Sequence, residues 1–298
     1  MRAVPMRGGE LVVAEVPDPV AGPGEVLVRT LACGICGSDL HMLQRVQRVL
    51  AGEEEPDTVF AFDHGADVVM GHEFCAEIVE FGPGCDEVLA VGQRVVSVPV
   101  MPRGDQRATL GYSNELPGGY AELMVLGEAN LVAVPDHVSS EEAALTEPMA
   151  VGRHAVAMSR LDQEAVATEV PVVVGCGPVG LSVIADLRRR GVERIVAADF
   201  SEKRRELASE VGATVVVDPR EVAPVDVWRA EVGATAGALD EPPVLMFECV
   251  GVPGMIQGMI DAVPRYSQVV VVGVCMQEDV IRPLSAIGKQ VNLQFVLG

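Results

Sequence analysis

The first half of the chain concentrates residue types that bind transition metals. The run CGICGSDLH at 33–41 is followed by GHE at 71–73 and, much later, by Glu147. Cysteine, histidine and carboxylate side chains are zinc ligands, and three protein ligands with a fourth position open form the catalytic arrangement. Residue type alone favours such a metal site and a set of buried structural cysteine and histidine side chains about equally.

Cys33 and Cys36 also form a C-x-x-C pair, which is typical of redox motifs and of half a structural zinc site. A four-cysteine zinc site needs a second closely spaced pair, and the sequence contains none. A thioredoxin-like pair is expected beside a βαβ unit, and the pattern around these cysteines does not indicate one.

A second constellation is rich in glycine. The segment GCGPVG at 175–180 follows an apolar strand and precedes a helical pattern, which is the context of a dinucleotide-binding fingerprint. Gly175 would make the tight turn, Gly177 would let the backbone approach a pyrophosphate, and Gly180 would let helix and strand pack closely. Asp199, at the end of the second strand, could accept hydrogen bonds from the adenosine ribose and would repel the extra phosphate of NADP. The glycines could also merely turn the chain, but the spacing of the acidic residue favours cofactor binding.

The elements that must position these residues differ between the two halves of the chain. Strands are expected in the second half at Val170–Gly175, Arg194–Phe200, Thr214–Asp218, Val244–Cys249, Gln268–Val274 and Asn292–Leu297. These apolar strands alternate with five crossovers, the first three clearly helical, which predicts an α/β fold with a doubly wound, six-stranded parallel sheet. The first half is irregular and rich in glycine and proline, with short strands such as Glu25–Leu31 and Arg94–Pro99.

The two halves meet between residues 140 and 170. Ser139-x-x-Glu142 predicts a capping box that opens a helix. Pro148 is expected to interrupt or kink that helix, and a second helical stretch is expected at His154–Arg160. The predicted domains are 1–150 and 151–298.

Composition excludes several classes of function. The 298 residues suggest two domains, and the net charge of −21 argues against binding to nucleic acid or to anionic membranes. Mean hydropathy is +0.31, yet no apolar run approaches the length of a membrane span and no secretory signal is evident. The seven cysteines are scattered and odd in number, which favours a reducing cytoplasm over a disulfide framework.

The joint order of the motifs is more specific than any one of them. CGICGSDLH, GHEF, the EP-x-AVG-x-HA stretch at 147–155 and GCGPVG resemble the zinc-dependent medium-chain alcohol dehydrogenases over essentially the whole chain. Within that family the chain is most similar to the polyol, diol and threonine dehydrogenase branch, in which an acid occupies the position of Glu147. The resemblance implies a β-rich, GroES-like catalytic domain followed by a Rossmann domain that binds NAD.

The resemblance also implies roles for individual residues. Cys36 and His72 would bind zinc, and Glu147 would bind it directly or through a water. Glu73 would lie behind the metal and could replace a ligand during turnover. Asp39 would orient His72.

Ser38 and His41 match the family's proton relay, in which the proton passes from the serine to the cofactor ribose, then to the histidine and to water. Cys33, Cys176 and Cys249 are interpreted as packing residues, and His64, His137 and His154 as loop or surface residues. The implied cofactor contacts are Gly175, Gly177, Pro178, Val179, Gly180, Asp199, Arg204, Val250 and Val274.

Three departures from the family pattern stand out. The stretch Val98–Gly119 contains no cysteine, whereas the family's structural zinc lobe has four, so one zinc is expected. The segment between His41 and His72, which includes Phe60, is longer than usual and is interpreted equally well as a lid or as a surface loop. Family members continue beyond the sixth strand to complete the catalytic domain, so the end at Gly298 suggests that this part is truncated or lost.

The expected function is oxidation of a secondary alcohol, polyol or related alcohol, with hydride transfer to NAD and zinc as Lewis acid. Two alternatives stay open: a non-catalytic dinucleotide-binding or redox-sensing protein, and a zinc-free quinone or enone reductase of the same fold. By analogy with the family, the strand Asn292–Leu297 would pair with its copy in a homodimer or homotetramer.

Overall fold

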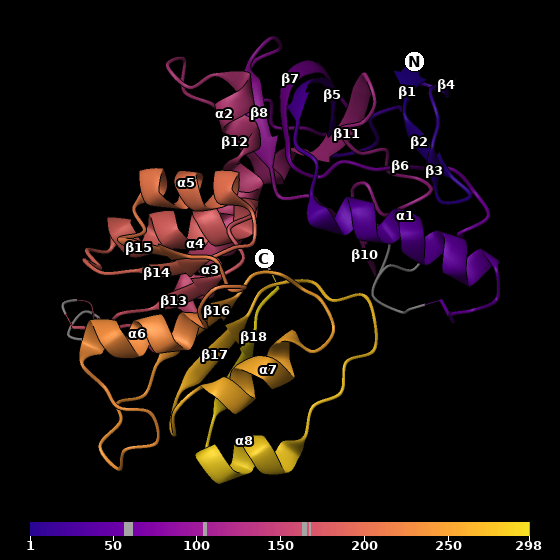
Figure 1. The fold of residues 1–298 in the computed structure, drawn as a ribbon. Helices are drawn as coiled ribbons and strands as arrows, with labels where there is room; N and C mark the ends of the chain where they lie inside the picture. Colours follow the sequence, from indigo (N-terminus) through magenta and orange to yellow (C-terminus); the bar gives the residue numbers. More distant parts are fainter. Residues whose placement is uncertain (57–61, 104–105, 163–165, 167, 298) are drawn as a thin grey trace. The chain divides into compact units, whose positions relative to one another are not determined.

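The computed structural model describes residues 1–56, 62–103, 106–162, 166 and 168–297 (Figure 1). The chain divides into two compact units, Met1–Glu147 and Pro148–Gly298. Each unit has its own sheets and its own buried clusters of apolar side chains.

The first unit is built around a five-stranded antiparallel sheet with the strand order β11-β5-β7-β8-β12. Its strands are β5 (Glu25–Cys33), β7 (Phe74–Phe81), β8 (Arg94–Ser97), β11 (Leu123–Gly127) and β12 (Leu131–Ala133). Smaller pairings join β1 (Arg2–Ala3) to β4 (Ala14–Glu15), β2 (Pro5–Arg7) to β3 (Glu10–Leu11) and β6 (Val68–Val69), and β9 (Val100–Arg103) to β10 (Gln106–Thr109). Val26 and Val28 of β5 alternate inward and meet Phe74 and Ile78 of β7 in the core, as expected for a half-buried strand.

Strand pairing brings two distant segments together. The last residue of β5, Cys33, pairs with Phe74, the first residue of β7. Helix α1 (Gly37–Leu50) begins soon after β5 ends, and residues 71–73 immediately precede β7. The start of α1 and the GHE segment therefore lie side by side, although more than thirty residues separate them in the chain.

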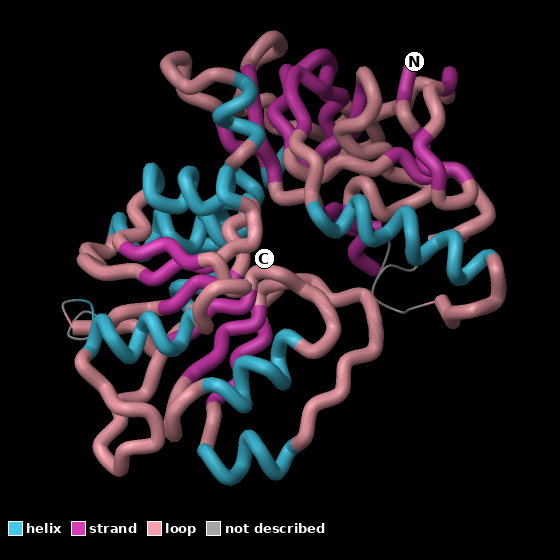
Figure 2. The backbone as a smooth tube through the Cα atoms, viewed as in Figure 1, coloured by secondary structure: helices cyan, strands magenta, loops and turns pink. Residues whose placement is uncertain are grey.

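The second unit is a six-stranded parallel sheet with the strand order β15-β14-β13-β16-β17-β18 (Figure 2). Its strands are β13 (Val172–Val174), β14 (Val196–Ala198), β15 (Val215–Val217), β16 (Leu245–Glu248), β17 (Gln268–Val271) and β18 (Asn292–Phe295). This order, 3-2-1-4-5-6 in chain sequence, is the doubly wound arrangement that the sequence predicts. Each observed strand falls inside its predicted range.

Helices cover both faces of this sheet. They are α4 (Pro178–Arg189), α5 (Glu202–Val211), α6 (Pro224–Val232), α7 (Met255–Ala262) and α8 (Pro283–Lys289). Apolar residues of α4 and α5 belong to one buried cluster, whereas those of α6 and α7 belong to another on the opposite face. All five crossovers thus contain a helix, including the last two. Among the described residues, no helix has the length and apolarity needed to cross a membrane.

The connection between the two halves differs partly from its prediction. Ser139 caps α2 (Ser140–Ala144) in a reciprocal capping box with Glu142, as predicted. The next helix, α3, covers Thr146–Ala157, so the predicted stretch His154–Arg160 was wrong at both ends. Pro148 lies in the first turn of α3 rather than in the interior of a helix. A proline is tolerated there because its missing N–H gives up no intrahelical hydrogen bond.

Candidate functional site

Three ligand-type side chains converge in the first unit. Cys36, His72 and Glu73 each offer one donor atom, and these atoms all lie within 4.8 Å of one another. Cys36 is the N-cap residue directly before α1, and the other two precede β7. His72 and Glu73 are buried. A thiol, an imidazole and a carboxyl group therefore share one small, largely enclosed space.

Glycines make room for this convergence. The backbone N–H of Gly34 donates to the carbonyl of Glu73 at 2.7 Å, and a Cβ on Gly34 would lie 2.2 Å from Glu73 Oε2. Gly71 has φ +99°, a region that favours glycine, and a Cβ there would lie 2.9 Å from Cys33 Sγ. The glycines on either side of the ligand-type residues thus allow two backbone segments to approach closely.

Asp39 lies behind the cluster as a buried carboxylate, with 1% of its surface exposed. Its Oδ2 accepts hydrogen bonds from the Cys36 backbone N–H at 3.1 Å and from the Tyr120 hydroxyl at 2.8 Å. Its Oδ1 accepts one from the Tyr112 hydroxyl at 3.0 Å. Burial alone would raise the pKa of Asp39, but His72 and the two tyrosines outweigh burial and lower it.

The imidazole of His72 faces this carboxylate. Its Nδ1 lies 3.5 Å from Asp39 Oδ1, and among the described residues it has no partner within hydrogen-bond geometry. Burial would lower the pKa of His72, but Asp39 and Cys36 outweigh it and raise the pKa to about 10. The surroundings of the ring therefore strongly favour a positive charge.

The wider cluster has an excess of acidic groups. Burial raises the pKa of both Glu73 and Glu147, and Asp39 raises both further. Within the described part of the chain, no lysine or arginine forms an ion pair with Cys36, Asp39, Glu73 or Glu147. Buried acidic groups need a compensating cation, and a thiol, an imidazole and carboxyl groups are the donors that zinc prefers. The residues present therefore fit a zinc ion.

Glu147 is not part of the tight group of three. Its carboxyl group is close enough for His72, Glu73 and Asp39 to influence its pKa, but its oxygens lie outside the 4.8 Å cluster. The cluster instead contains Glu73, which the sequence places behind the metal. Which of the two acids binds a metal directly stays a prediction.

The proposed relay residues lie on the first turns of α1. Ser38 and His41 are three residues apart, so they project from one face of the helix. The Tyr112 hydroxyl lies 2.8 Å from Ser38 Oγ. Both side chains are partly exposed, as residues that exchange protons with solvent need to be.

Tyr112 and Tyr120 are site residues that the sequence analysis missed. Tyr112 lies in the stretch 98–119, which the sequence analysis considered only because it contains no cysteine. Backbone hydrogen bonds from Gly118, Gly119 and Tyr120 to the carbonyls of residues 69–71 fasten this stretch beside His72. The only signal in the sequence was that two of the chain's three tyrosines lie close to the adjacent glycines Gly118 and Gly119.

Cys33 is half-buried, and its thiol contacts the carbonyl of Gly34 at 3.4 Å. Burial raises its pKa to about 12, which describes an unreactive thiol. Part of the long segment between His41 and His72, residues 57–61 with Phe60, lies outside the described residues. Glu54, in the same segment, forms ion pairs with Arg45 and Arg48 of α1.

The glycine loop of the second unit has the geometry of a pyrophosphate-binding turn. Gly175 has φ +92°, and a Cβ on Gly180 would lie only 1.8 Å from the carbonyl oxygen of Gly175. A Cβ on Gly177 would meet nothing within 4 Å. Pro178 begins α4, and the first intrahelical bond runs from Leu181 N–H to Gly177 O. The amides of Val179 and Gly180 therefore precede the helical ladder and can bind an anion.

Asp199 follows β14 and holds the loop in place. Its Oδ2 accepts from the Cys176 backbone N–H and its Oδ1 from the Ser201 N–H, both at 2.8 Å. Arg204 Nη1 lies 3.7 Å from the same carboxylate. The acidic residue and the glycine loop are thus one connected structure, beside which a ribose can bind.

The remaining predicted cofactor residues lie at the same edge of the sheet. Val250 Cγ2 would contact a Cβ on Gly175, and the backbone of Val274 lies against Gly251. Cys176 is fully buried and Cys249 partly buried, which agrees with a packing role. The carboxyl ends of the parallel strands, where doubly wound sheets bind ligands, therefore bring these residues together.

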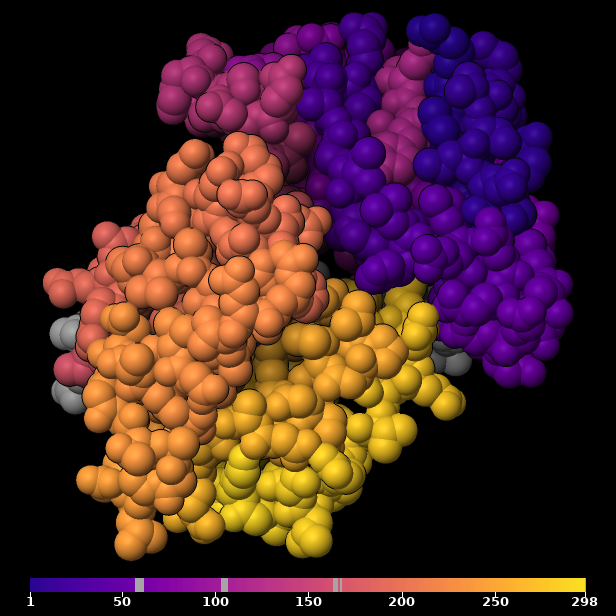
Figure 3. All heavy atoms as spheres, in the orientation of Figure 1, coloured from indigo at the N-terminus to yellow at the C-terminus, as the bar shows by residue number. Residues whose placement is uncertain are grey.

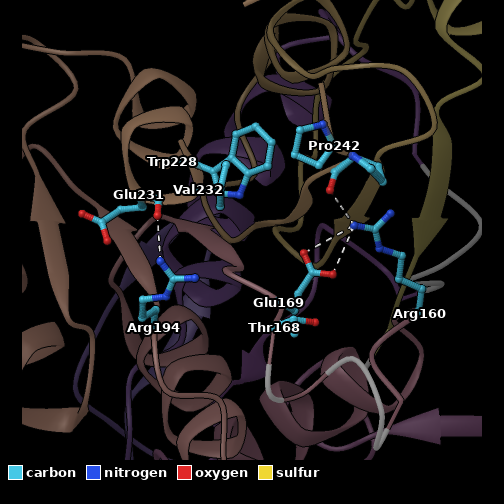
Figure 4. A pocket seen from close by; sticks show the side chains of 9 residues that line it. Arg160, Thr168, Glu169, Arg194, Trp228, Glu231, Val232 and Pro242 are labelled. Carbon is cyan, nitrogen blue, oxygen red and sulfur yellow. Dashed lines mark hydrogen bonds and ion pairs between the residues drawn. The ribbon is translucent and has the colours of Figure 1, made fainter. Parts of the chain in front are cut away.

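A separate cavity of about 630 Å³ lies at the opposite edge, near the amino ends of β13, β14 and β16 (Figure 4). Arg160 donates to Glu169 and to the carbonyl of Pro243, and Arg194 donates to the carbonyl of Glu231. Because its arginines are paired and it lies away from the glycine loop, this cavity is not the candidate cofactor site.

Both halves of the chain match known protein families. Residues 22–136 match the family model "Alcohol dehydrogenase GroES-like domain", and residues 178–298 match "Zinc-binding dehydrogenase". The chain is 32% identical to (R,R)-butanediol dehydrogenase of Bacillus subtilis over 97% of its own length and 82% of that relative. It is 30% identical to L-threonine 3-dehydrogenase of Sinorhizobium medicae over 97% of its length and 80% of that relative.

Solved structures show the same fold. The crystal structure of 2R,3R-butanediol dehydrogenase from Bacillus subtilis matches with a TM-score of 0.77 and 30% identity, over 100% of this chain and 84% of that one. The chain belongs to the zinc-dependent medium-chain alcohol dehydrogenase family. Within that family it falls with the butanediol and threonine dehydrogenases. It is an oxidoreductase that uses zinc and a nicotinamide cofactor.

The close contact at Gly180 yields a test of the cofactor site. Gly180→Ala should weaken NADH binding at least tenfold, because the new Cβ would push α4 away from the Gly175 carbonyl. Gly258→Ala in α7, where a Cβ meets nothing within 4 Å, is the matched control. NADH fluorescence titration measures both, and emission of the single, buried Trp228 reports whether each variant is folded. Unchanged NADH affinity in Gly180→Ala would contradict the assignment.

Proposed function

We propose that the chain oxidises a secondary alcohol of the diol or polyol type, using one zinc ion in the first unit and NAD in the second. The observation that carries this proposal is the buried cluster of Cys36, His72 and Glu73 with Asp39 behind the imidazole. The two relatives named above are, by their names, dehydrogenases of butanediol and threonine. Each of those compounds has a secondary hydroxyl group next to a carbon that bears another polar group.

Cys36 and His72 would hold the zinc, together with Glu147 or Glu73. When bound, zinc would polarise the substrate oxygen as a Lewis acid, and the nicotinamide would take up the hydride. The thiolate and one carboxylate would offset both charges of the metal and leave the site near neutral. Asp39 would hold a proton on Nδ1 of His72, so that Nε2 keeps its lone pair for the metal.

Ser38 and His41 would remove the proton that the substrate hydroxyl loses. Ser38 would accept it at Oγ and at the same time give up its own hydroxyl proton, and His41, on the same face of α1, would deliver a proton to water. The alcohol thus loses a hydride from carbon and a proton from oxygen, and it becomes a ketone.

The count of one zinc rests on the stretch 98–119. It contains no cysteine, and its described residues include the paired strands β9 and β10 and the turn that carries Tyr112. No group of three metal-ligating side chains other than Cys36, His72 and Glu73 occurs among the described residues.

Asp199 supports NAD over NADP. Its carboxylate has 9% of its surface exposed and accepts two backbone amides. A phosphate on the ribose would meet this negative charge, and Arg204, at 3.7 Å, would offset only part of the repulsion.

Self-association and a cytoplasmic location are also inferred. The edge strand β18 and helix α8 carry exposed apolar side chains, including Leu284, Ile287 and Phe295. The C-terminal segment lies at the surface of the second unit (yellow in Figure 3). Pairing of two β18 edges would give a dimer. All seven cysteines are unpaired, as is usual for a protein of a reducing compartment.

Metal analysis tests the central part of the proposal. The purified protein should contain about one zinc per chain. Cys36→Ala should lose the zinc and the turnover and keep its affinity for NADH, because the glycine loop is untouched. Cys33→Ala, which removes the other thiol of the C-x-x-C pair, should keep the zinc. If Cys36→Ala retains both zinc and activity, the ligand set is wrong.

Cofactor preference is tested by titration with NADH and NADPH. We expect NADH to bind more tightly, because the Asp199 carboxylate repels the additional phosphate. Asp199→Asn keeps the size of the side chain and removes the charge. It should therefore narrow the difference in affinity between NADH and NADPH, mainly by improving NADPH binding. Tighter binding of NADPH to the unchanged protein would overturn the NAD assignment.

His41→Gln tests the proton relay separately from the metal. The variant should keep its zinc and its NADH affinity but oxidise alcohol more slowly, by at most about a hundredfold, since water can bypass the end of a relay. Added imidazole should recover part of the rate, because it accepts the proton directly. Zinc loss in this variant, or an unchanged rate when the chemical step limits turnover, would remove His41 from the mechanism.

A further inference from the structure

The hydroxyl of Tyr112 connects two parts of the site that have different tasks. Its oxygen lies 2.8 Å from Ser38 Oγ and 3.0 Å from Asp39 Oδ1. Tyr112 is buried, and its ring centroid lies 5.4 Å from that of His72. One phenol therefore touches the hydroxyl that would accept the substrate's proton and the carboxylate that faces the metal-ligand histidine.

The number of hydrogens fixes the direction of these bonds. A phenol has one hydrogen, and an ionised carboxylate can only accept. Tyr112 must therefore donate to Asp39, and the Ser38 hydroxyl must donate to the oxygen of Tyr112. With its own hydrogen directed at Tyr112, Ser38 presents lone pairs in its remaining directions. An oxygen in that state is ready to accept a hydrogen bond from a substrate hydroxyl. When the substrate's proton moves to Oγ, the hydrogen that Ser38 already carries must leave Tyr112 and pass on toward His41, so that the serine stays neutral.

We propose that Tyr112 is a positioning residue that turns the Ser38 hydroxyl into an acceptor and, through the same oxygen, supports the Asp39 carboxylate behind His72. This inference rests on the proposed function, in which Ser38 accepts the substrate's proton. It gives the cysteine-free stretch 98–119 a role in the site. Without this inference, the stretch matters to the proposed function only because it lacks the cysteines of a structural zinc site.

The local fold holds Tyr112 firmly in this place. Its backbone N–H donates to Thr109 O at 3.1 Å, and the preceding Leu110 N–H donates to Pro99 O at 2.9 Å. Gly111, with φ +81°, packs against the backbone of Gly71, next to His72. The turn after β10 is therefore attached to the segment that carries the histidine.

Tyr120 provides a matched comparison within the same site. Its hydroxyl donates to Asp39 Oδ2 at 2.8 Å and lies 3.3 Å from the carbonyl of Gly34. Tyr112 and Tyr120 thus support the two oxygens of one carboxylate, but among the described contacts only Tyr112 reaches Ser38. The third tyrosine, Tyr266, is exposed and lies in the second unit, so it serves as a neutral control.

The experiment compares Tyr112→Phe, Tyr120→Phe and Tyr266→Phe in the zinc-loaded enzyme. Two measurements are made: the rate at which a chelator removes zinc, and the steady-state oxidation of 2,3-butanediol, which gives kcat and KM. Both site variants should lose zinc faster by a similar factor. That factor should lie at or below the roughly 10–100-fold typical of a direct partner of a ligand histidine, because both tyrosines act on His72 through Asp39. Only Tyr112→Phe should also lower kcat, by about 2–12-fold beyond Tyr120→Phe, which corresponds to one hydrogen bond. Tyr266→Phe should match the unchanged protein both in its rate of zinc loss and in its oxidation of 2,3-butanediol.

Ser38→Ala completes the test and separates it from the proposed function. Alone, it should abolish most turnover and leave zinc loss unchanged, because Tyr112 still donates to Asp39. In the Ser38→Ala background, Tyr112→Phe and Tyr120→Phe should have equal effects on turnover. If Tyr112→Phe equals Tyr120→Phe in both measurements, the inference fails and the proposed function stands. If Ser38→Ala keeps full turnover, the proposed relay itself is wrong. Should Tyr112→Phe not fold, as judged by Trp228 emission, faster zinc loss in Ser38→Ala would overturn the inference by itself.

Discussion

The buried carboxylate of Asp39 is the interaction on which the first unit's site depends. An ionised group with so little contact with water is costly unless it is fully hydrogen-bonded. Asp39 meets this requirement with one backbone amide and two phenols, and it faces the ring of His72. The amide belongs to Cys36, so one carboxylate fixes both the N-cap residue of α1 and the orientation of the histidine. The positions of the two strongest candidate ligands are thus coupled through a group that need not touch the metal.

The second unit could be predicted from sequence almost completely, because its signals are local. Runs such as Val172–Val174 are apolar without alternation, as strands buried on both faces are, and Gly175–Gly180 follows the first of them as a glycine-rich turn. The first unit offered no such pattern, because its strands are short and pair across long distances. The bond between Tyr112 and Asp39 spans 73 residues. No periodicity encodes such a contact, which depends on the pairing of whole loops.

The errors near the connection have a common physical origin. Pro148 was expected to disrupt a helix, but in the first turn of α3 its missing N–H removes no hydrogen bond. The helix could therefore start eight residues earlier than predicted, at Thr146, and it carries Glu147 in its first turn. Because the predicted start of the helix was wrong, residue spacing alone could not predict how the Glu147 side chain approaches Glu73 and Asp39. Its direction depends on where the helix begins, and a sequence pattern locates that point only within a few residues.

Both units use one physical device to hold their functional loops. A carboxylate near the end of an element accepts the amides of the neighbouring turn: Asp39 accepts Cys36 N–H, Asp199 accepts Cys176 and Ser201, and Glu248 accepts Val250 and Gly251. An ionised carboxylate has about four acceptor directions, so two amides leave room for further donors. At Asp199 those directions can receive ribose hydroxyls, and at Asp39 they receive phenols. A carboxylate already fixed by the backbone loses little freedom when a further donor arrives, so the acid that shapes each loop can accept that donor at a low cost in entropy.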